Sequence, residues 1–307
     1  MNLKKLRVVI LSNDDLTSNV IFAPLFTQPD VEVVGLAFTT TINPKKTGLR
    51  GVFSLLKKMD WRYWLYQVFI NGFYKVYEAL TLRLNFPDNA LPVLRRLCAR
   101  KNIPVFTSAN FNGEDFLSQL RSLKPDLLII RVNQILRAPV LAIPTHGTWC
   151  IHSSLLPAYG GIAAECHALA RGERRMGSAL FHVSLQLDQG TVLARREMAC
   201  NPNCSVFSHM LANNRLAGNL LADCAQTLSL KGALPPTALD DTLQPSYYSW
   251  PQAADLALLR QRGIPLMHVR DMIRHVARCL GLGLRSDAIP AKAPGSFLTR
   301  EVTPVTP

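Results

Sequence analysis

The sequence predicts an α/β fold with a mostly parallel sheet, and three observations support this prediction. Residues 6–11 are apolar except for Arg7, a pattern that is typical of a strand buried on both faces. Residues 31–38, which are apolar except for Glu32, and the apolar residues 127–130 are predicted to be further strands, and segments with helical spacing lie between the three. Strands that alternate with helices in this way favour parallel pairing through right-handed connections.

The other elements follow in chain order from local patterns. Ser18 is placed to cap a helix that continues to residue 26. The Gly- and Pro-containing segment 232–236 is expected to end a long helix. Two short helices are expected beyond residue 250, and the Pro- and Ala-rich tail beyond residue 283 is expected to fray. The remaining predicted helices are residues 91–101, 112–123 and 205–230, and the remaining predicted strands are residues 103–106 and 147–152.

An insertion at about residues 43–88 interrupts the alternation. It carries eight basic and three acidic residues, a difference of +5, and its aromatic positions 66, 69, 73 and 77 follow helical spacing. An amphipathic helical pair that packs on the sheet or at a homodimer interface is the favoured interpretation. A lid, a partner-docking helix and an interfacial membrane helix remain alternatives.

Composition narrows the function classes without choosing one. Hydrophobic residues make up 48% of the 307 residues, which fits a globular protein and excludes a disordered one. The formal net charge of +13 favours anionic partners. No run of 18 apolar residues occurs, so a transmembrane helix is not expected. With no export signal, the seven cysteines are expected to be thiols in a reducing cytoplasm, and their spacing does not suggest a metal site.

Polar side chains gather around the predicted strand at residues 147–152. Cys150 and His152 should project from one face of that strand, because side chains alternate with a period of two. Further on, Asp188 stands two residues before Gly190. A His, an Asp and a third polar group are sufficient for proton transfer and oxyanion stabilisation. Taken singly, such a His is more often structural, and such an Asp more often forms a turn.

The spacing of these residues resembles a known family motif. That motif reads Asn-x-His, then Pro-Ser-Leu-Leu-Pro, a Tyr and a Gly, and later Asp-x-Gly. It is the motif of the folate-dependent formyltransferases, which include methionyl-tRNA formyltransferase, glycinamide ribonucleotide transformylase and sugar N-formyltransferases. The segment Lys124-Pro125-Asp126-Leu127 fits the same family. The matching positions are His152, Ser154, Leu155, Leu156, Pro157, Tyr159, Gly161, Ala168, Gly172, Gly177, His182, Asp188 and Gly190.

The resemblance covers roughly residues 1–230, which are therefore expected to form the catalytic domain. It implies a Rossmann-like formyltransferase fold with a helical insertion and leaves residues 231–307 as a small, partly helical C-terminal extension. The implied co-substrate is 10-formyltetrahydrofolate, and no metal is implied. By the same resemblance, His152 would stabilise the oxyanion or move protons, and Asp188 would tune His152. Binding of the pterin is assigned to Ile130, Val132, Leu185, Leu187 and Gly190, and binding of the acceptor to Ser154, Tyr159 and Gly161.

Cys150 departs from the family pattern, because it stands where members carry the Asn that donates to the formyl oxygen. A thiol is a weak donor, and loss of one oxyanion donor costs roughly 10²–10³ in rate. Formyl transfer could persist with another donor. Alternatively, Cys150 could act as a nucleophile for acyl transfer, hydrolysis or cyclisation. The third interpretation is an inactive binding or scaffold homologue. Ser153 and Gly160 are milder departures, in place of a Pro and an Arg.

The expected acceptor is a small or carrier-bound amine, such as an amino sugar nucleotide or an amino-acid-derived precursor. The chain beyond residue 245 is short and has a helical pattern with no RNA-binding motif, so a nucleic-acid partner is not expected. The basic, aromatic insertion would suit a phosphorylated acceptor or an acidic carrier protein. A peripheral membrane contact of the insertion is the less favoured alternative.

Overall fold

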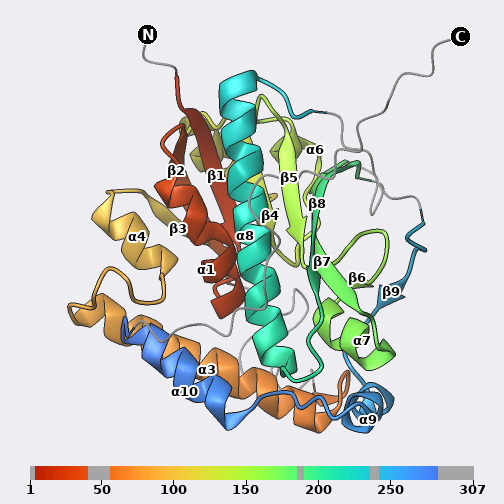
Figure 1. Ribbon diagram of the computed structural model, residues 1–307. Helices are drawn as coiled ribbons and strands as arrows, with labels where there is room; N and C mark the ends of the chain where they lie inside the picture. The colour runs from red at the N-terminus through yellow and green to blue at the C-terminus, as the bar shows by residue number, and fades with distance from the viewer. Residues whose placement is uncertain (1–3, 41–55, 185–189, 236–241, 283–307) are drawn as a thin grey trace, which may run out of the picture.

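A seven-stranded, mostly parallel sheet forms the centre of the computed structural model, which describes residues 4–40, 56–184, 190–235 and 242–282 (Figure 1). The strand order is β3-β2-β1-β4-β5-β7-β8. The first five strands pair in parallel, and β7 pairs antiparallel with both β5 and β8. The strands are β1 (Leu6–Ser12), β2 (Val31–Thr39), β3 (Val105–Ser108), β4 (Leu127–Arg131), β5 (Thr148–His152), β7 (Arg175–His182) and β8 (Val192–Ala199). A separate two-stranded sheet pairs β6 (Gly160–Gly161) with β9 (Tyr247–Tyr248).

Helices cover both faces of the main sheet. The long helix α8 runs along one face (Figure 1), and α5 packs on the other. The helices are α1 (Leu16–Phe22), the 3₁₀ helix η1 (Ala23–Thr27), α3 (Trp61–Arg83), α4 (Leu94–Arg100), α5 (Glu114–Ser122), α6 (Ala138–Leu141), α7 (Ala164–Arg171), α8 (Val206–Lys231), α9 (Ala253–Gln261) and α10 (Val269–Cys279).

The central strands are buried on both faces, as their continuous apolar runs predict. In β1, Val8 and Ile10 pack with Leu221 of α8, whereas Val9 and Leu11 pack with the α5 side. Each face of the sheet therefore removes a separate set of apolar side chains from water. The α/β fold class predicted from the sequence is confirmed.

Two predicted helix starts are wrong, and a competing N-cap residue explains the first. Asp15, and not Ser18, caps α1, because the Asp15 carboxylate accepts from the backbone N–H of Ser18 at 2.7 Å. The same segment continues as the 3₁₀ helix η1, which has Pro24 in its first turn. The helix expected at residues 91–101 begins only at Leu94, where the backbone leaves an extended segment.

The described part of the insertion is the long helix α3, and residues 41–55 lie outside the described residues. Its buried stripe is Tyr63, Tyr66, Ile70, Tyr74 and Tyr77. The predicted stripe at positions 66, 69, 73 and 77 is therefore only half right, because Phe69 faces outward and Phe73 is half-buried. Figure 1 shows α3 and α10 side by side across the end of the sheet where β1, β4 and β5 finish.

The described part of the C-terminal extension packs closely against the rest of the chain. Leu256 and Leu259 of α9 and Cys279 of α10 share one hydrophobic core with Tyr63 of α3 and Leu169 of α7. The strand β9 pairs with the loop after β5 through β6. Among the described helices, none is both long enough and apolar enough to cross a membrane.

Candidate active site

The carboxyl ends of three neighbouring parallel strands place polar side chains at one edge of the sheet. Asp14 and Asp15 follow β1, Arg131 ends β4 and His152 ends β5. Functional groups commonly lie at this edge in α/β folds. Arg131 extends across to the neighbouring loop, where its Nη1 donates to Ser18 Oγ at 3.1 Å and lies 3.4 Å from Asp15 Oδ2.

Cys150 lies in the middle of this region. It pairs with Ile130 of β4 on one side and with Phe181 of β7 on the other. The thiol is half-buried, and its Sγ lies 4.0 Å from the carbonyl oxygen of Ile151, at the limit of a sulfur hydrogen bond. Burial raises the pKa of Cys150 to about 12, against the opposing influence of Arg131. Near neutral pH the group is therefore a thiol.

His152 has a defined hydrogen-bonding arrangement. Its Nε2 donates to the carbonyl oxygen of Gly161 at 3.1 Å, since a carbonyl can only accept. The Ser154 hydroxyl lies 2.8 Å from Nδ1 and donates to it in this tautomer. Ser154 is itself buried. The two contacts fix the orientation of the imidazole ring.

The loop after β5 is held from two sides. Ser153 donates to Asn214 of α8 at 2.9 Å, and Asn213 donates to the carbonyl oxygen of Ser153 at 3.1 Å. The Ser at this position, where the family carries Pro, thus anchors the loop to α8. Gly161 has a φ of 95°, and a Cβ there would meet the Tyr248 carbonyl oxygen at 2.1 Å, so this position requires glycine.

Only part of the predicted pterin-binding set is described. Ile130 is buried at the end of β4, and Val132 is half-buried beside the same core. Gly190 has no room for a side chain, because a Cβ would lie 2.3 Å from the carbonyl oxygen of His182. Leu185, Leu187 and the predicted catalytic Asp188 lie outside the described residues. The assignment of pterin contacts therefore stays a prediction.

Tyr159 is engaged in a cluster with the C-terminal extension. Its hydroxyl donates to Glu173 at 2.7 Å, and its ring stacks on Tyr248 with centroids 5.4 Å apart. Gly160 is close to the same strand, since a Cβ there would lie 3.3 Å from the Ser246 carbonyl oxygen. An acceptor role for Tyr159 would thus involve a surface that the extension helps to build.

Two residues that the sequence interpretation did not single out belong to this region. Arg131 is close enough to act electrostatically on both Cys150 and Glu165. Glu165, in the first turn of α7, is buried and accepts from Asn213 at 3.0 Å. Burial raises the pKa of its carboxyl, while Asn213 and Arg131 act in the opposite direction. Arg131 could have been found from the sequence, because it is a charged residue that directly follows a run of buried apolar residues. No such sequence pattern marks Glu165.

An ionic network joins the strand edge to α3. Asp14 contacts Lys75 at 2.7 Å and Arg95 at 2.9 Å, and Arg95 also lies 3.4 Å from Glu78. Although burial acts to raise it, these cations hold the pKa of Asp14 below its usual value. Tyr74 reinforces the junction, because its hydroxyl accepts from Asn19 of α1 and donates to Glu78. The inner face of α3 is therefore fixed over the strand ends.

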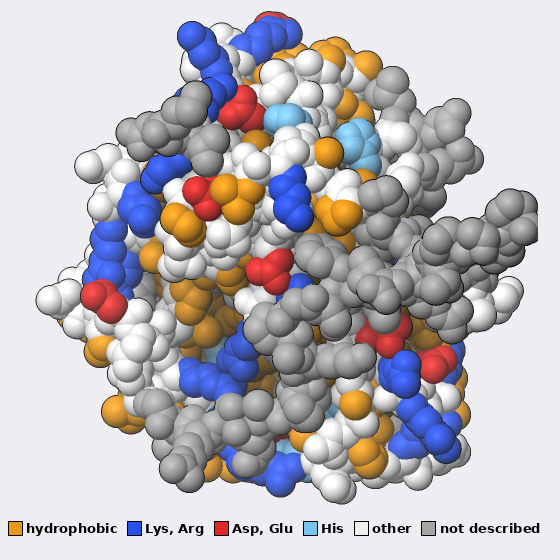
Figure 2. Space-filling model, turned by 45° about the horizontal axis from the view of Figure 1, so that its top comes forward, with side chains coloured by type: hydrophobic (Ala, Val, Ile, Leu, Met, Phe, Trp, Pro, Cys, Tyr) orange, Lys and Arg blue, Asp and Glu red, His pale blue; other side chains and the backbone are white. Residues whose placement is uncertain are grey.

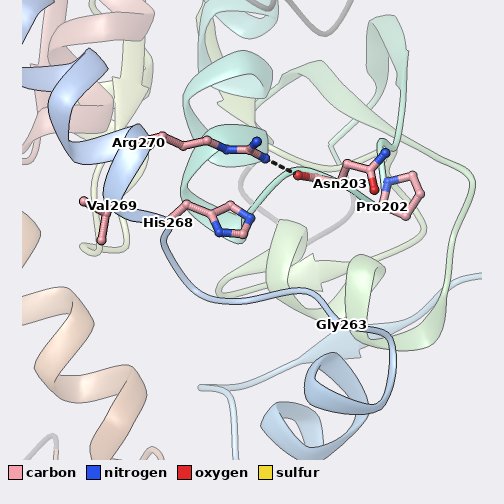
Figure 3. A pocket seen from close by; sticks show the side chains of 6 residues that line it. All are labelled: Pro202, Asn203, Gly263, His268, Val269 and Arg270. Atoms are coloured by element: carbon pink, nitrogen blue, oxygen red, sulfur yellow. Dashed lines mark hydrogen bonds between the residues drawn. The ribbon is translucent and has the colours of Figure 1, made fainter.

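A surface hollow elsewhere contains none of the predicted site residues. It lies where the loop before α8 meets the start of α10, and Arg270 bridges it by donating to the carbonyl oxygen of Asn203 (Figure 3). Among the described residues, no group of three His, Cys, Asp or Glu side chains is arranged to hold a metal ion. The residues around this hollow are Pro202, Asn203, Gly263, His268, Val269 and Arg270.

Comparison with known proteins finds a family that one segment of the chain matches. Residues 88–217 match the formyl transferase family. This segment includes β4, β5 and the loop that carries His152 and Ser154. This segment is therefore similar to a formyltransferase domain. The resemblance that the motif suggested is thereby confirmed, and the domain's family is one of transferases.

Relatives of known name match this domain over part of their length. The methionyl-tRNA formyltransferase of Stenotrophomonas maltophilia is 40% identical over 108 residues, which is 35% of this chain and 35% of that protein. The methionyl-tRNA formyltransferase of Acidithiobacillus ferrooxidans is 38% identical over 135 residues, which is 43% of this chain and 42% of that protein. The chain thus spans less than half the length of these relatives.

Solved structures agree on the fold. Glycinamide ribonucleotide transformylase 1 from Symbiobacterium toebii superposes with a TM-score of 0.50 at 14% identity, covering 76% of this chain and 92% of that one. Phosphoribosylglycinamide formyltransferase from Anaplasma phagocytophilum gives 0.50 at 15% identity, covering 81% and 99%. At such identities the likeness concerns the fold alone, and it confirms the Rossmann-like formyltransferase fold.

Proposed function

We propose that this protein transfers a formyl group from 10-formyltetrahydrofolate to an amine on a small or carrier-bound acceptor. The observation that carries the proposal is the oriented His152 at the carboxyl edge of the sheet, inside the formyltransferase domain. The fold supports the same conclusion. The acceptor and the donor are both part of the proposal.

Formyl transfer needs a donor for the developing oxyanion and a route for the amine proton. The acceptor nitrogen attacks the formyl carbon, the carbonyl electrons move to oxygen, and collapse of the tetrahedral intermediate releases the folate nitrogen. His152 carries an N–H on Nε2 that could turn from the Gly161 carbonyl to the oxyanion. Ser154 would hold the ring in the required tautomer by donating to Nδ1. Asp188 is proposed to assist proton removal, as the resemblance implies.

The state of Cys150 favours ordinary transfer over the covalent alternative. A nucleophilic cysteine reacts as the thiolate, which a positive surrounding normally stabilises. Burial instead raises the pKa of Cys150 to about 12, so the thiolate is scarce at neutral pH. The intact contacts of His152 with Ser154 and Gly161 also speak against an inactive scaffold. Cys150 is therefore proposed to be a neutral wall of the site and at most a weak donor.

The acceptor is proposed to be an anionic amine, such as an amino sugar nucleotide or a carrier-bound amino-acid derivative. The net charge is +13, and Lys and Arg side chains recur over the face in Figure 2, where Asp and Glu are fewer. Two relatives are named for a carrier-bound acceptor, methionyl-tRNA, but their similarity is confined to less than half of each protein. The similarity therefore does not extend to the remaining parts of those two relatives.

Binding of a non-reactive folate analogue tests the donor directly. Isothermal titration of the full chain should give micromolar affinity. The variant His152→Ala should bind the analogue with similar affinity, yet should lose formyl transfer from 10-formyltetrahydrofolate to amine acceptors, followed as a formyl mass increment on the product. Absence of binding in the wild-type protein would contradict the inherited donor.

A further inference from the structure

The helix α3 is apolar on both of its faces. Its inner stripe of tyrosines and Ile70 is buried against the strand ends and α10. The opposite stripe is exposed, with Phe69 at 48% and Val76 at 62% of full exposure. A helix of 23 residues is about 34 Å long, so the exposed stripe is extended. The large apolar residues of this stripe are Trp61, Leu65, Val68, Phe69, Val76 and Leu80.

The neighbouring helix α10 widens this apolar surface. It lies beside α3, where the rings of Phe73 and His275 are 5.4 Å apart (Figure 1). Val269 and Ile273, one helical turn apart, are 80% and 60% exposed on the side away from the buried His275. These two residues and the exposed stripe of α3 are called the outer face below. Exposed apolar surfaces of this extent mark interaction sites.

The exposed charges on α3 and α10 themselves are basic, whereas Asp60 and Asp88, which flank α3, are paired with Arg62 and Arg100. Among the described residues of α3 and α10, the carboxylates are Glu78 and Asp271, and both are buried. Glu78 is bound to Lys75, and Asp271 accepts from Ser205 and Ser208. The exposed charges of the two helices are basic, and Lys57 and Lys58 add two more just before α3. The exposed basic residues of these two helices are Arg83, Arg270 and Lys75, of which Lys75 is paired with Asp14 and Glu78.

We propose that the outer face of α3 and α10 docks on a lipid surface that carries anionic headgroups. Helices that lie in a membrane interface combine a large apolar face with Lys and Arg at its border, which is the arrangement found here. A second copy of the chain is the poorer occupant, because pairing two such faces would bring like charges together. The inner face of α3 covers the strand ends, so docking leaves the edge of the sheet with His152 on the lipid side of the molecule.

Co-sedimentation of the full chain with vesicles tests the proposal. The protein should bind vesicles of phosphatidylcholine mixed with phosphatidylglycerol, and should bind pure phosphatidylcholine much more weakly. Val76→Asp and Ile273→Asp should each lower the partition coefficient by about tenfold, since a carboxylate replaces an aliphatic side chain that lipid would bury. The matched control is Leu230→Asp, at an exposed site of 51% at the far end of α8, which should bind like the wild type.

Trp61 supplies an independent signal, because it is 61% exposed at the start of the outer face. Its fluorescence should shift to shorter wavelength on addition of anionic vesicles, and Trp61→Phe should remove most of the shift. Circular dichroism must show that each variant is folded. Failure of the wild type to bind anionic vesicles would overturn the proposal, as would equal loss of binding in Leu230→Asp. Dimerisation that Val76→Asp abolishes, without any vesicle binding, would assign the outer face to a second copy instead.

Discussion

Cys150 stands where the motif that this sequence resembles has an Asn, and its environment allows a directional prediction. Cys150→Asn would restore an amide donor beside His152 and should raise kcat for formyl transfer by about tenfold or more, because one oxyanion donor is worth roughly 10²–10³ in rate. Steady-state kinetics with the native acceptor checks this. Cys150→Ala, which adds no donor, is the control and should not raise kcat. A loss of activity in Cys150→Asn would indicate a different chemistry.

The thiol of Cys150 should also be unreactive in the folded protein. Since burial raises its pKa to about 12, alkylation by iodoacetamide at neutral pH should be far slower than in the denatured chain, where thiols titrate near the ordinary value. Mass spectrometry of the peptide that contains Cys150 measures the rate. Rapid labelling near pH 7 would contradict the neutral state assigned to it and revive the covalent alternative.

Ser154 is predicted to act on the reaction through His152. Ser154→Ala removes the hydroxyl that lies 2.8 Å from Nδ1, so the ring loses the contact that fixes its tautomer. We expect kcat to fall by about tenfold with little change in KM, because ground-state binding is not the interaction removed. The neighbouring Ser153→Ala, which loses only the contact with Asn214, is the control and should affect stability more than kcat.

The sequence could predict some of these residues and not others. The period of two along β5 placed Cys150 and His152 on one face, and both are the half-buried members of that strand. The bond between Ser154 and His152 depends on the turn that follows, which no periodicity describes. Glu165 and Asn213 meet from elements 48 residues apart in the chain, so only the packed structure brings them together.

At the scale of elements, the inner face of α3 should stabilise the fold through polar groups as well as apolar ones. Tyr74→Phe removes a buried hydroxyl that accepts from Asn19 and donates to Glu78. We expect a loss of about 1–3 kcal/mol in the free energy of unfolding, because two buried polar groups lose a partner. Urea denaturation checks this. Val76→Ala, on the exposed side of the same helix, should change stability by less than about 0.5 kcal/mol.

The buried His275 of α10 should make the free energy of unfolding depend on pH in the acidic range. Burial, with the charges of Arg278 and Arg215, lowers the pKa of His275 from 6.5 to about 4. Between these two values the unfolded chain binds the proton and the folded chain does not, so stability is present above pH 6.5 and is lost as the pH falls toward 4. The loss should amount to about 3 kcal/mol, because a tenfold difference in proton affinity between the two states is worth about 1.4 kcal/mol. His275→Leu should flatten the dependence of urea midpoints on pH across this range, and an unchanged slope would contradict the assignment.

Element prediction from sequence succeeded where burial dictates the pattern and failed where local polar groups compete. The buried strands β1, β2 and β4 are evident from their largely apolar sequences, and α8 (Val206–Lys231) lies close to the predicted range 205–230 and ends at Gly232 as predicted. The start of α1 was missed because Asp15 and Ser18 are both suitable caps, and backbone geometry decides between them. The stripe on α3 was half wrong because that helix is apolar all round, so spacing cannot tell the inner from the outer face.

At the scale of the whole molecule, the order of the strands and the position of the extension are what the sequence could not supply. At one edge of the sheet, β7 pairs antiparallel with β5 and with β8. No local sequence pattern distinguishes these strands from the parallel ones. The sequence predicts residues 231–307 as a C-terminal extension, and the α9 and α10 of this extension bury apolar residues in the core that α3 and α7 also line. Two units that share a core should unfold together, unlike domains joined by a linker.

This shared core allows a test of the cooperativity of unfolding. Leu259 of α9 is 2% exposed, and Leu259→Ala should lower the free energy of unfolding by about 2–5 kcal/mol. Because α9 shares its core with α3 and α7, native-state hydrogen exchange should show the same loss of protection in β1 as in α9. Leu258→Ala, at the half-exposed neighbouring position, is the control and should leave both unchanged. Loss of protection confined to α9 and α10 would show that the extension opens alone, in which case residues 231–307 are a separable unit that the catalytic fold does not need.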